Sequence, residues 1–354
     1  MHLGGTSMAL INPEINDVTS VLHPARPPKE MASTSVLPDG RTKLRYNYST
    51  LTRSMECMRA TYYGIVKGYR PQFESPALIY GSAVHAFSEI AYTSAIADRK
   101  LLTLEEFELR AMGHPWKREG YSAFQKAFDA FMEIHKPLTS LPETDKRSSL
   151  NAAWLVFHFS RLISEDPYIA YVDDKGPFME RSFSLVVYED EKIVIEIFGT
   201  IDFVLQHTVT GQLMPGDFKT SSSLFFNGSS FFDKEKPNHQ YSGYMLGLRE
   251  VFGLDVKDFM VQVIEVKARP KTVRGSSPSF PRQITTRTED DFEEFRESIA
   301  YYGKLYLRAL EDGIWPQGPV QSCAAYGACQ FRQVCAAPKS MRQTILDNTF
   351  KRSL

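Results

Sequence analysis

The chain contains 354 residues, of which 43% are hydrophobic and 12% aromatic, enough to bury a sizeable core in one large domain or two smaller ones. Its formal net charge is −1, which excludes a strongly basic coat, so any contact with nucleic acid must come from a local groove. No apolar run approaches the ~20 residues of a membrane span, and the N-terminus lacks the basic and apolar regions of a signal peptide. We therefore expect a globular protein that has no membrane segment and is cytoplasmic.

Residues 1–44 contain several prolines with Ser and Thr between them and no sustained helical period, so we expect a flexible N-terminal arm. Structured sequence is expected over 45–338, with a polar tail at 339–354. The first helix is predicted to begin at an N-cap, Ser49, and it carries Cys57. A single cysteine among apolar neighbours is usually a packed core thiol.

Two helical regions precede the first predicted strand. Residues 80–92 are predicted to form a helix on which His85 and Glu89 lie four positions apart and therefore share a face. An isolated histidine in that setting is usually buried beside a carboxylate. Residues 100–165 show repeated helical periodicity with an aromatic stripe, which indicates core packing. We predict a helical insert there, covering a sheet.

From Pro177 onwards the hydrophobic period changes to two. This pattern predicts three consecutive antiparallel strands over 178–187, 193–205 and 213–219. A fourth strand is expected within 259–266.

Helices are predicted on both sides of that fourth strand. The first, over 237–248, places Gln240 and Tyr244 on one face, and the second is a long amphipathic helix over 289–310. Between them lies a polar loop at 269–285, which is either a flexible nucleic-acid contact or an ordinary solvated loop. Its basic residues are Lys271, Arg274 and Arg282.

The second and third strands of this group carry two carboxylates and a lysine. Asp217 and Lys219 are separated by one residue on a strand, so their side chains leave on the same face, and a hairpin would bring Asp202 beside Asp217. Paired carboxylates suit Mg²⁺ or Mn²⁺, and the lysine could orient or deprotonate a water molecule. The alternative is a surface Asp–Lys ion pair. Asp202 favours the metal site, because it ends an apolar β-branched run where an unpartnered carboxylate is unfavourable.

These residues occur in motifs that resemble those of the PD-(D/E)XK nuclease superfamily, and most closely its RecB-like branch, which includes the CRISPR-associated RecB-like exonucleases. The matching segments, in chain order, are Gly81-Ser-Ala-Val-His85, Gly199-Thr-Ile-Asp202, Asp217-Phe-Lys219 and Gln240-Tyr-Ser-Gly-Tyr244, with Glu180 in the place of an acidic residue that often precedes the hairpin. Ile201 stands where the superfamily's proline would be, as is usual in this branch. The resemblance covers residues 46–336.

The resemblance implies an α/β fold, with a central mixed sheet flanked by helices on both faces. It also implies a metal-dependent DNA exonuclease acting on single-stranded DNA or DNA ends, in DNA repair, recombination, phage replication or CRISPR adaptation. His85, Asp202 and Asp217 would bind Mg²⁺ or Mn²⁺, and Lys219 would orient or activate the water. Gln240 and Tyr244 would bind the substrate, either by supporting the site or by contacting DNA.

Two other functions remain open at this stage. One is a non-catalytic DNA-end-binding or assembly module for a helicase, recombinase or CRISPR adaptation partner. The other is a restriction-type endonuclease. A homo-oligomer is also compatible with the resemblance.

The chain has four cysteines, and four is the number that either a zinc ion or an iron–sulfur cluster requires. They are Cys57, Cys323, Cys329 and Cys335. Both gaps within the segment 323–335 are five residues, longer than the two to four that paired zinc ligands favour. The RecB-like resemblance implies that these cysteines hold a 4Fe-4S cluster that ties the first helix to the C-terminal segment, with Zn²⁺ as the alternative.

Overall fold

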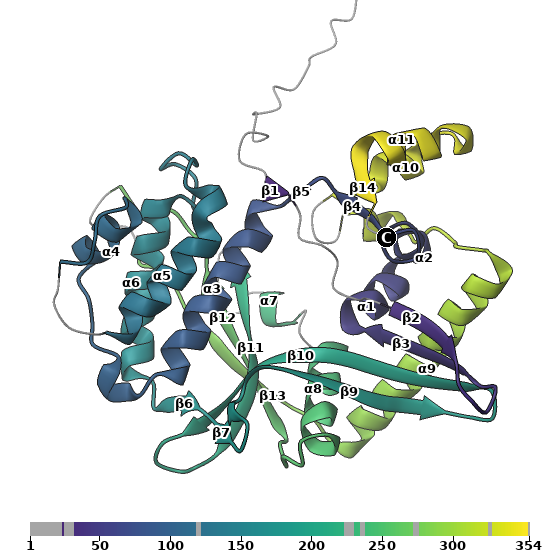
Figure 1. Cartoon of the computed structure of the whole chain (residues 1–354), viewed down its shortest axis with the longest axis horizontal. Coiled ribbons are helices and arrows are strands. Elements are labelled where there is room, and N and C mark those ends of the chain that lie inside the picture. The colour runs from purple at the N-terminus through teal and green to yellow at the C-terminus, as the bar shows by residue number, and fades with distance from the viewer. Residues whose placement is uncertain are drawn as a thin grey trace, which may run out of the picture.

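The computed structural model describes residues 23–24, 32–117, 122–222, 230–233, 238–271, 276–324 and 328–352. An eight-stranded mixed sheet runs through these residues (Figure 1). Six strands follow one another in the order β13-β12-β11-β10-β3-β2, and β9 and β6 also pair with β10. The sheet is therefore organised around β10.

Strand β10 (Ile193–His207) is the longest in the sheet and changes partners along its length. Its first half pairs antiparallel with β9 (Met179–Glu189) and parallel with β3 (Thr42–Asn47). Its second half pairs antiparallel with β6 (Tyr168–Ala170) and β11 (Leu213–Ser221). The three consecutive antiparallel strands expected from the period-two pattern are confirmed.

The sheet is completed by strands at its two sides. Beyond β11 lie β12 (Asp258–Glu265), which runs parallel to β11, and β13 (Arg282–Thr286), which is antiparallel to β12. At the other side β2 (Ala32–Val36) pairs antiparallel with β3. The sheet therefore mixes parallel and antiparallel pairs, which confirms the predicted fold class.

One face of the sheet is covered by α3 and the predicted helical insert, which lie together at the left of Figure 1. Helix α3 (Pro76–Thr93) begins at the N-cap Ser75, whose side chain accepts a hydrogen bond from Leu78, and has proline at its first position. The insert contributes α4 (Leu104–Ala111), α5 (Ala123–His135) and α6 (Ser149–Glu165). Their aromatic stripe is buried: Phe107, Phe124, Phe128, Phe131 and Phe159 are all at most 1% exposed.

The opposite face is covered by α1 (Tyr48–Glu56), α8 (His239–Glu250) and α9 (Glu289–Asp312). Tyr46 on β3 donates from its hydroxyl to the carbonyl of Ile299 on α9 at 2.9 Å, which ties the sheet to this layer. Helices on both faces, as expected, place the sheet in the middle of the molecule.

The C-terminal segment packs against the chain that follows α1 (Figure 1). There, α2 (Met58–Thr61), a π-helical turn (Tyr62–Val66) and β4 (Tyr69–Pro71) meet α10 (Arg332–Ala336), α11 (Arg342–Thr349) and β14 (Phe350–Arg352). Strand β14 pairs with β4, and the side chains of Leu346 and Phe350 are buried. The prediction of a polar tail over 339–354 is therefore wrong for residues 339–352, because two apolar side chains anchor them.

The predicted flexible arm is also wrong over its last part. Residues 32–44 contribute β2 and the start of β3 to the sheet, and Leu44 is completely buried. Residues 1–22 and 25–31 of that arm lie outside the described residues, while β1 (His23–Pro24) pairs with β5 (Phe73–Glu74). Residues 32–36 show no helical or apolar pattern of their own, so their pairing with β3 could not be predicted from the local sequence.

Two details of the first helix differ from expectation. The side chain of Asn47, not Ser49, caps α1 by accepting a hydrogen bond from the Thr50 amide at 2.9 Å. Cys57 lies at the C-cap of α1, at the junction with α2.

The remaining elements are short. The 3₁₀ turns are Ile96–Asp98, Lys136–Leu138, Val320–Cys323 and Lys339–Met341, and the others are β7 (Val172–Asp173), β8 (Gly176–Pro177) and α7 (Ser230–Asp233). No helix among the described residues is long and apolar enough to cross a membrane.

Candidate metal centre and cysteine site

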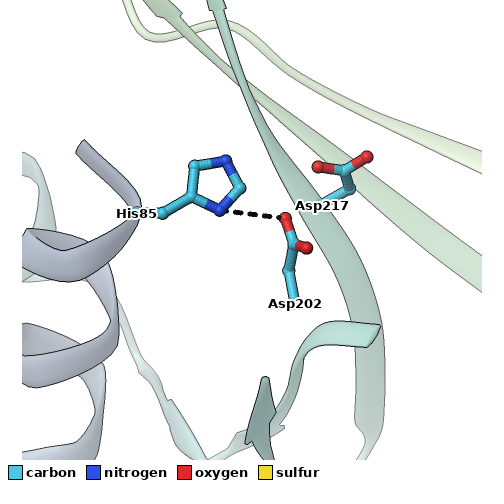
Figure 2. A group of neighbouring side chains, drawn as sticks. All are labelled: His85, Asp202 and Asp217. Atoms are coloured by element: carbon cyan, nitrogen blue, oxygen red, sulfur yellow. Dashed lines mark ion pairs between the residues drawn. The ribbon is translucent and has the colours of Figure 1, made fainter. Parts of the chain in front are cut away.

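Three side chains from three elements meet beside the middle of β10. His85 projects from α3, Asp202 from β10 and Asp217 from β11, and one potential ligand atom from each lies within 4.8 Å of the others. Figure 2 shows the imidazole facing Asp202, with His85 Nδ1 and Asp202 Oδ2 3.4 Å apart. The sequence motifs placed far apart in the chain are therefore brought together by the fold.

The main chain of Phe218 holds two of these groups in place. His85 Nε2 lies 2.8 Å from the Phe218 carbonyl, and because that oxygen only accepts, Nε2 carries the proton. The Phe218 amide donates to Asp202 Oδ2 at 3.2 Å. When the imidazole is neutral, its Nδ1 lone pair thus faces the carboxylates, which is the orientation a metal ligand needs.

The ring of Phe218 anchors this stretch of β11 in the core. It is 3% exposed and lies between the rings of Phe203, at a centroid distance of 4.5 Å, and Tyr92, at 5.8 Å. The paired register of β10 and β11 ends at Phe203 and Gly216, immediately before the two aspartates. The side chain of Asp202 accepts a hydrogen bond at the point where the pairing of β10 with β11 stops.

Lys219 is tied to the carboxylates on one side and to α8 on the other. Its ammonium forms an ion pair with Asp217 Oδ2 and donates to Oε1 of Gln240 at 3.2 Å. Gln240 in turn donates from Nε2 to the Tyr244 hydroxyl at 2.8 Å. All six residues predicted for the active site therefore lie in one connected group.

The charges in this group compete for protons. Burial raises the pKa of Asp202 well above its usual range, the Asp217 charge adds to the effect, and His85 opposes it. Burial lowers the pKa of His85, but its hydrogen bond to Glu180 and the charges of Asp202 and Asp217 outweigh burial and raise that pKa to about 9. A concentration of negative charge that binds a proton this strongly is also suited to a divalent cation.

Glu180 lies beside the same site and has an unusual backbone conformation. Its φ is +50°, the only positive value among the described residues other than glycine. Its Oε1 lies 3.8 Å from His85 Nδ1. Strained backbone of this kind is concentrated at functional sites, where the surrounding structure holds it in place.

A cavity of about 510 Å³ opens beside these residues along α3. It is lined by Gly81, Ser82, His85, Glu89, Glu180 and Thr220, among others. Burial, followed by the charge of Glu180, raises the pKa of Glu89. Sequence reasoning placed Glu89 on the His85 face but not in the site; its i+4 spacing from His85 was the available signal.

The cysteines gather at a second place, around the cluster that joins α2 to the C-terminal segment. Cys57, Cys329 and Cys335 pack against the apolar side chains of that cluster. The Gly318 amide donates to Cys57 Sγ at 3.2 Å, and the Cys329 amide donates to the Cys323 carbonyl at 2.9 Å. All four are free thiols of intermediate exposure.

The spacing of the thiols bears on which metal group would fit. Burial raises the pKa of Cys335, and the neighbouring Cys57 and Cys329 raise it further against the opposing charge of Arg59. Among the described residues, only the His85 group brings three ligand atoms within 4.8 Å. A tetrahedral zinc ion with Zn–S bonds of ~2.3 Å requires sulfurs roughly 3.8 Å apart. Among the described residues, no three cysteine sulfurs lie within 4.8 Å of one another.

One basic residue of the predicted polar loop at 269–285 is tied to the fold. Arg282 lies on β13, where it donates to the Gln262 side chain at 2.8 Å and forms an ion pair with Asp166. Asp166 is 6% exposed, so the exposed Arg282 neutralises a buried carboxylate. Arg274 lies outside the described residues.

Comparison with known proteins gives limited information. No protein-family model matches the chain, and no curated protein matches it. Among solved structures, a crystal structure of a candidate exonuclease from Eubacterium rectale aligns at a TM-score of 0.38 and 11% identity, covering 84% of this chain and 96% of that one. Similarity at this level carries no functional argument, so the functional assignment has to come from the site.

Proposed function

We propose that the protein is a metal-dependent nuclease, specifically a DNA exonuclease of the PD-(D/E)XK superfamily and its RecB-like branch. The observation that carries the proposal is the convergence of His85, Asp202 and Asp217 within 4.8 Å, with Lys219 paired to Asp217. Two carboxylates and one imidazole are a hard donor set suited to Mg²⁺ or Mn²⁺. The order of the sequence motifs supports the same assignment.

The residues of this site have distinct roles in phosphodiester hydrolysis. A bound Mg²⁺ or Mn²⁺ would polarise the scissile phosphate and lower the pKa of a bound water. Asp202 and Asp217 supply the negative charge that holds the cation, and His85 offers Nδ1. Lys219 orients the attacking water or offsets the charge that develops on the phosphate.

Gln240 and Tyr244 position the lysine. The hydrogen bond from Lys219 to Gln240 holds the ammonium from the side opposite Asp217, and the Tyr244 hydroxyl accepts from the same amide. A lysine on a flexible four-carbon stem needs such restraint to be placed to within a fraction of an ångström.

The substrate that we propose is single-stranded DNA or a DNA end. The cavity beside the site is lined on the α3 side by the small residues Gly81 and Ser82, which leave room for a nucleic-acid backbone to approach. Glu89 and Glu180 at the same cavity would repel phosphate in the absence of a cation. Phosphate contact is therefore expected to depend on the metal.

The cysteine site is proposed to hold a 4Fe-4S cluster, with Zn²⁺ as the alternative. Cys57 precedes the catalytic elements, while Cys323, Cys329 and Cys335 follow them, so the metal would link two distant parts of the chain. Its proposed role is structural, because three of the cysteines pack against a different apolar cluster from the one that contains Phe203 and Phe218, the neighbours of the two aspartates. A homo-oligomer or a recombination or CRISPR partner is compatible with this proposal.

The test is hydrolysis of end-labelled single- and double-stranded DNA by protein purified without oxygen, with Mg²⁺, Mn²⁺ or EDTA. We expect metal-dependent release of labelled product, which Asp217→Asn and Lys219→Ala abolish. The matched control is Lys126→Ala, at an exposed position on α5. Full activity in both active-site variants would overturn the mechanism, whereas binding of DNA ends without hydrolysis would favour a non-catalytic module.

A further inference from the structure

The cysteine site is accompanied by an arginine that forms no ion pair among the described residues and buries one of its guanidinium nitrogens. Arg53 Nη1 is fully buried and has no hydrogen-bond partner among the described residues. A guanidinium does not lose its proton in proteins, so it remains charged where it lies. A buried unpaired cation is strongly unfavourable, which indicates that an anion belongs beside it.

The position of Arg53 on α1 directs it to the cysteines. Cys57 follows it by four residues at the C-cap of α1, where the Cys57 amide donates to the Arg53 carbonyl at 2.8 Å. Burial lowers the pKa of Arg53, while charge on Cys329, Glu56 and Cys57 would raise it. Glu56 is the one carboxylate in this set, and no ion pair joins it to Arg53 among the described residues.

Other cations surround the same place. Burial, followed by the charge of Arg53, lowers the pKa of Arg70. Arg342 donates to the Cys335 carbonyl at 3.2 Å, and the charges of both Arg59 and Arg342 lower the pKa of the Cys335 thiol.

The fold makes room for the Arg53 guanidinium at a glycine. A Cβ atom added at Gly64 would come within 2.6 Å of Arg53 Nη1 and 3.5 Å of the Phe331 ring. Phe331 lies in the segment between Cys329 and Cys335. The head group is therefore enclosed between the π-helical turn and the C-terminal cysteine segment.

We propose that Arg53 is the positioning residue and counter-cation of an anionic metal–thiolate centre formed by Cys57, Cys323, Cys329 and Cys335. This inference rests on the proposed cysteine centre. Four thiolates around either a 2+ iron–sulfur cluster or Zn²⁺ carry a net charge of −2, so the electrostatic argument holds for both groups. Arg53 would donate to a thiolate or sulfide sulfur and compensate part of that charge.

The test compares metal retention and stability, without measuring nuclease activity. Wild type, Arg53→Met and Arg53→Lys are purified without oxygen, and iron, sulfide and zinc are counted per chain. Loss of metal to a chelator is then timed, and thermal unfolding is recorded for the metal-loaded and for the reduced, metal-free protein. Arg332→Met is the matched control, because Arg332 lies between two of the cysteines but is exposed.

We expect Arg53→Met to lose its metal about tenfold faster or more, the effect of removing one hydrogen bond to a charged group. Arg53→Lys should fall between Arg53→Met and wild type, and Arg332→Met should match wild type. In the metal-free state Arg53→Met should unfold at or above the wild-type temperature, since the substitution removes an uncompensated buried charge. An ordinary packing role would instead destabilise both states.

Gly64→Ala provides a second variant that keeps the positive charge but displaces the guanidinium. It should also accelerate metal loss. Wild-type retention of metal in both Arg53→Met and Gly64→Ala would overturn the role of Arg53 and leave the metal centre intact. A wild-type protein with four titratable thiols and no metal would overturn the centre itself, and with it the inference.

Discussion

His85 Nδ1 and Asp202 Oδ2 lie 3.4 Å apart, and the main chain of one residue, Phe218, bonds to both side chains. The carbonyl of Phe218 sets the tautomer of the histidine, and its amide orients the carboxylate. The neighbours of Phe218 in the sequence are Asp217 and Lys219. A single stretch of three residues therefore supplies two side chains of the candidate site and positions two more.

Metal affinity is expected to rise with pH. The pKa of His85 is raised to about 9 in the metal-free protein, so the imidazole is protonated at neutral pH and must lose a proton before Nδ1 binds a cation. The apparent affinity for Mn²⁺ should increase by up to about tenfold per pH unit between pH 7 and 9, then level off. Calorimetric titration across this range measures it, and a flat profile would contradict the assignment of Nδ1 as a ligand.

The raised pKa of His85 also makes the stability of the metal-free protein depend on pH. A folded-state pKa above the unfolded value of ~6.5 means that protonated His85 stabilises the fold. This contribution is complete below pH ~6.5 and is lost as the pH rises through about 9. Denaturant unfolding in EDTA should show a decline over that window, and the decline should be reduced in His85→Gln.

Substituting the residues that support Lys219 should reduce the turnover number more than the stability of the fold. In Gln240→Leu the ammonium loses the acceptor at 3.2 Å, and in Tyr244→Phe the Gln240 amide loses its own acceptor at 2.8 Å. We expect kcat to fall about tenfold or more in the first and less in the second, because a positioning hydrogen bond is worth ~1–2 kcal/mol. Their combined effect should be less than additive, since both act through Lys219. Additive losses would indicate that the two residues act separately.

Gly216 is predicted to tolerate no side chain. A Cβ there would lie 2.3 Å from Phe203 Cζ and 2.4 Å from the Met260 carbonyl oxygen, and the latter belongs to the backbone of β12. Gly216→Ala should therefore destabilise the protein by about 1–3 kcal/mol or more through overpacking, as measured by urea unfolding. Gly81→Ala is the contrasting variant, because its Cβ would approach only Thr220 Oγ1, at 3.4 Å. If both variants unfolded alike, the close approach of β10, β11 and β12 would be in error.

The C-terminal residues should contribute to stability. Phe350 is 8% exposed, and its ring centroid lies 5.0 Å from that of Phe331, next to the cysteine segment. Phe350→Ala should cost about 3 kcal/mol and should loosen metal binding at the cysteines. Lys351→Ala, whose side chain is only partly buried, is the adjacent control. An unchanged unfolding midpoint in Phe350→Ala would show that residues 339–352 are dispensable.

Local patterns in the sequence predicted much of the fold and most of the site. The period-two run predicts β9, β10 and β11, and the one-residue spacing of Asp217 and Lys219 places them on one face without knowledge of any partner. The helical period likewise predicts α3, the insert and α9. These features depend on neighbours within four residues along the chain, and the sequence displays such neighbours directly.

The sequence by itself determined which side chains are available for chemistry and on which side of each helix or strand they lie. The tertiary structure alone decided that β10 pairs first with β3 and then with β11 along one edge. It also decided that Glu180 and Glu89 line the cavity, and that Arg282 forms an ion pair with Asp166. It decided further that residues 32–36 and 339–352 pack, and that Arg53 Nη1 is buried. The physical reason is that these outcomes depend on pairing and burial between separate segments of the chain, whose free energies no local period encodes.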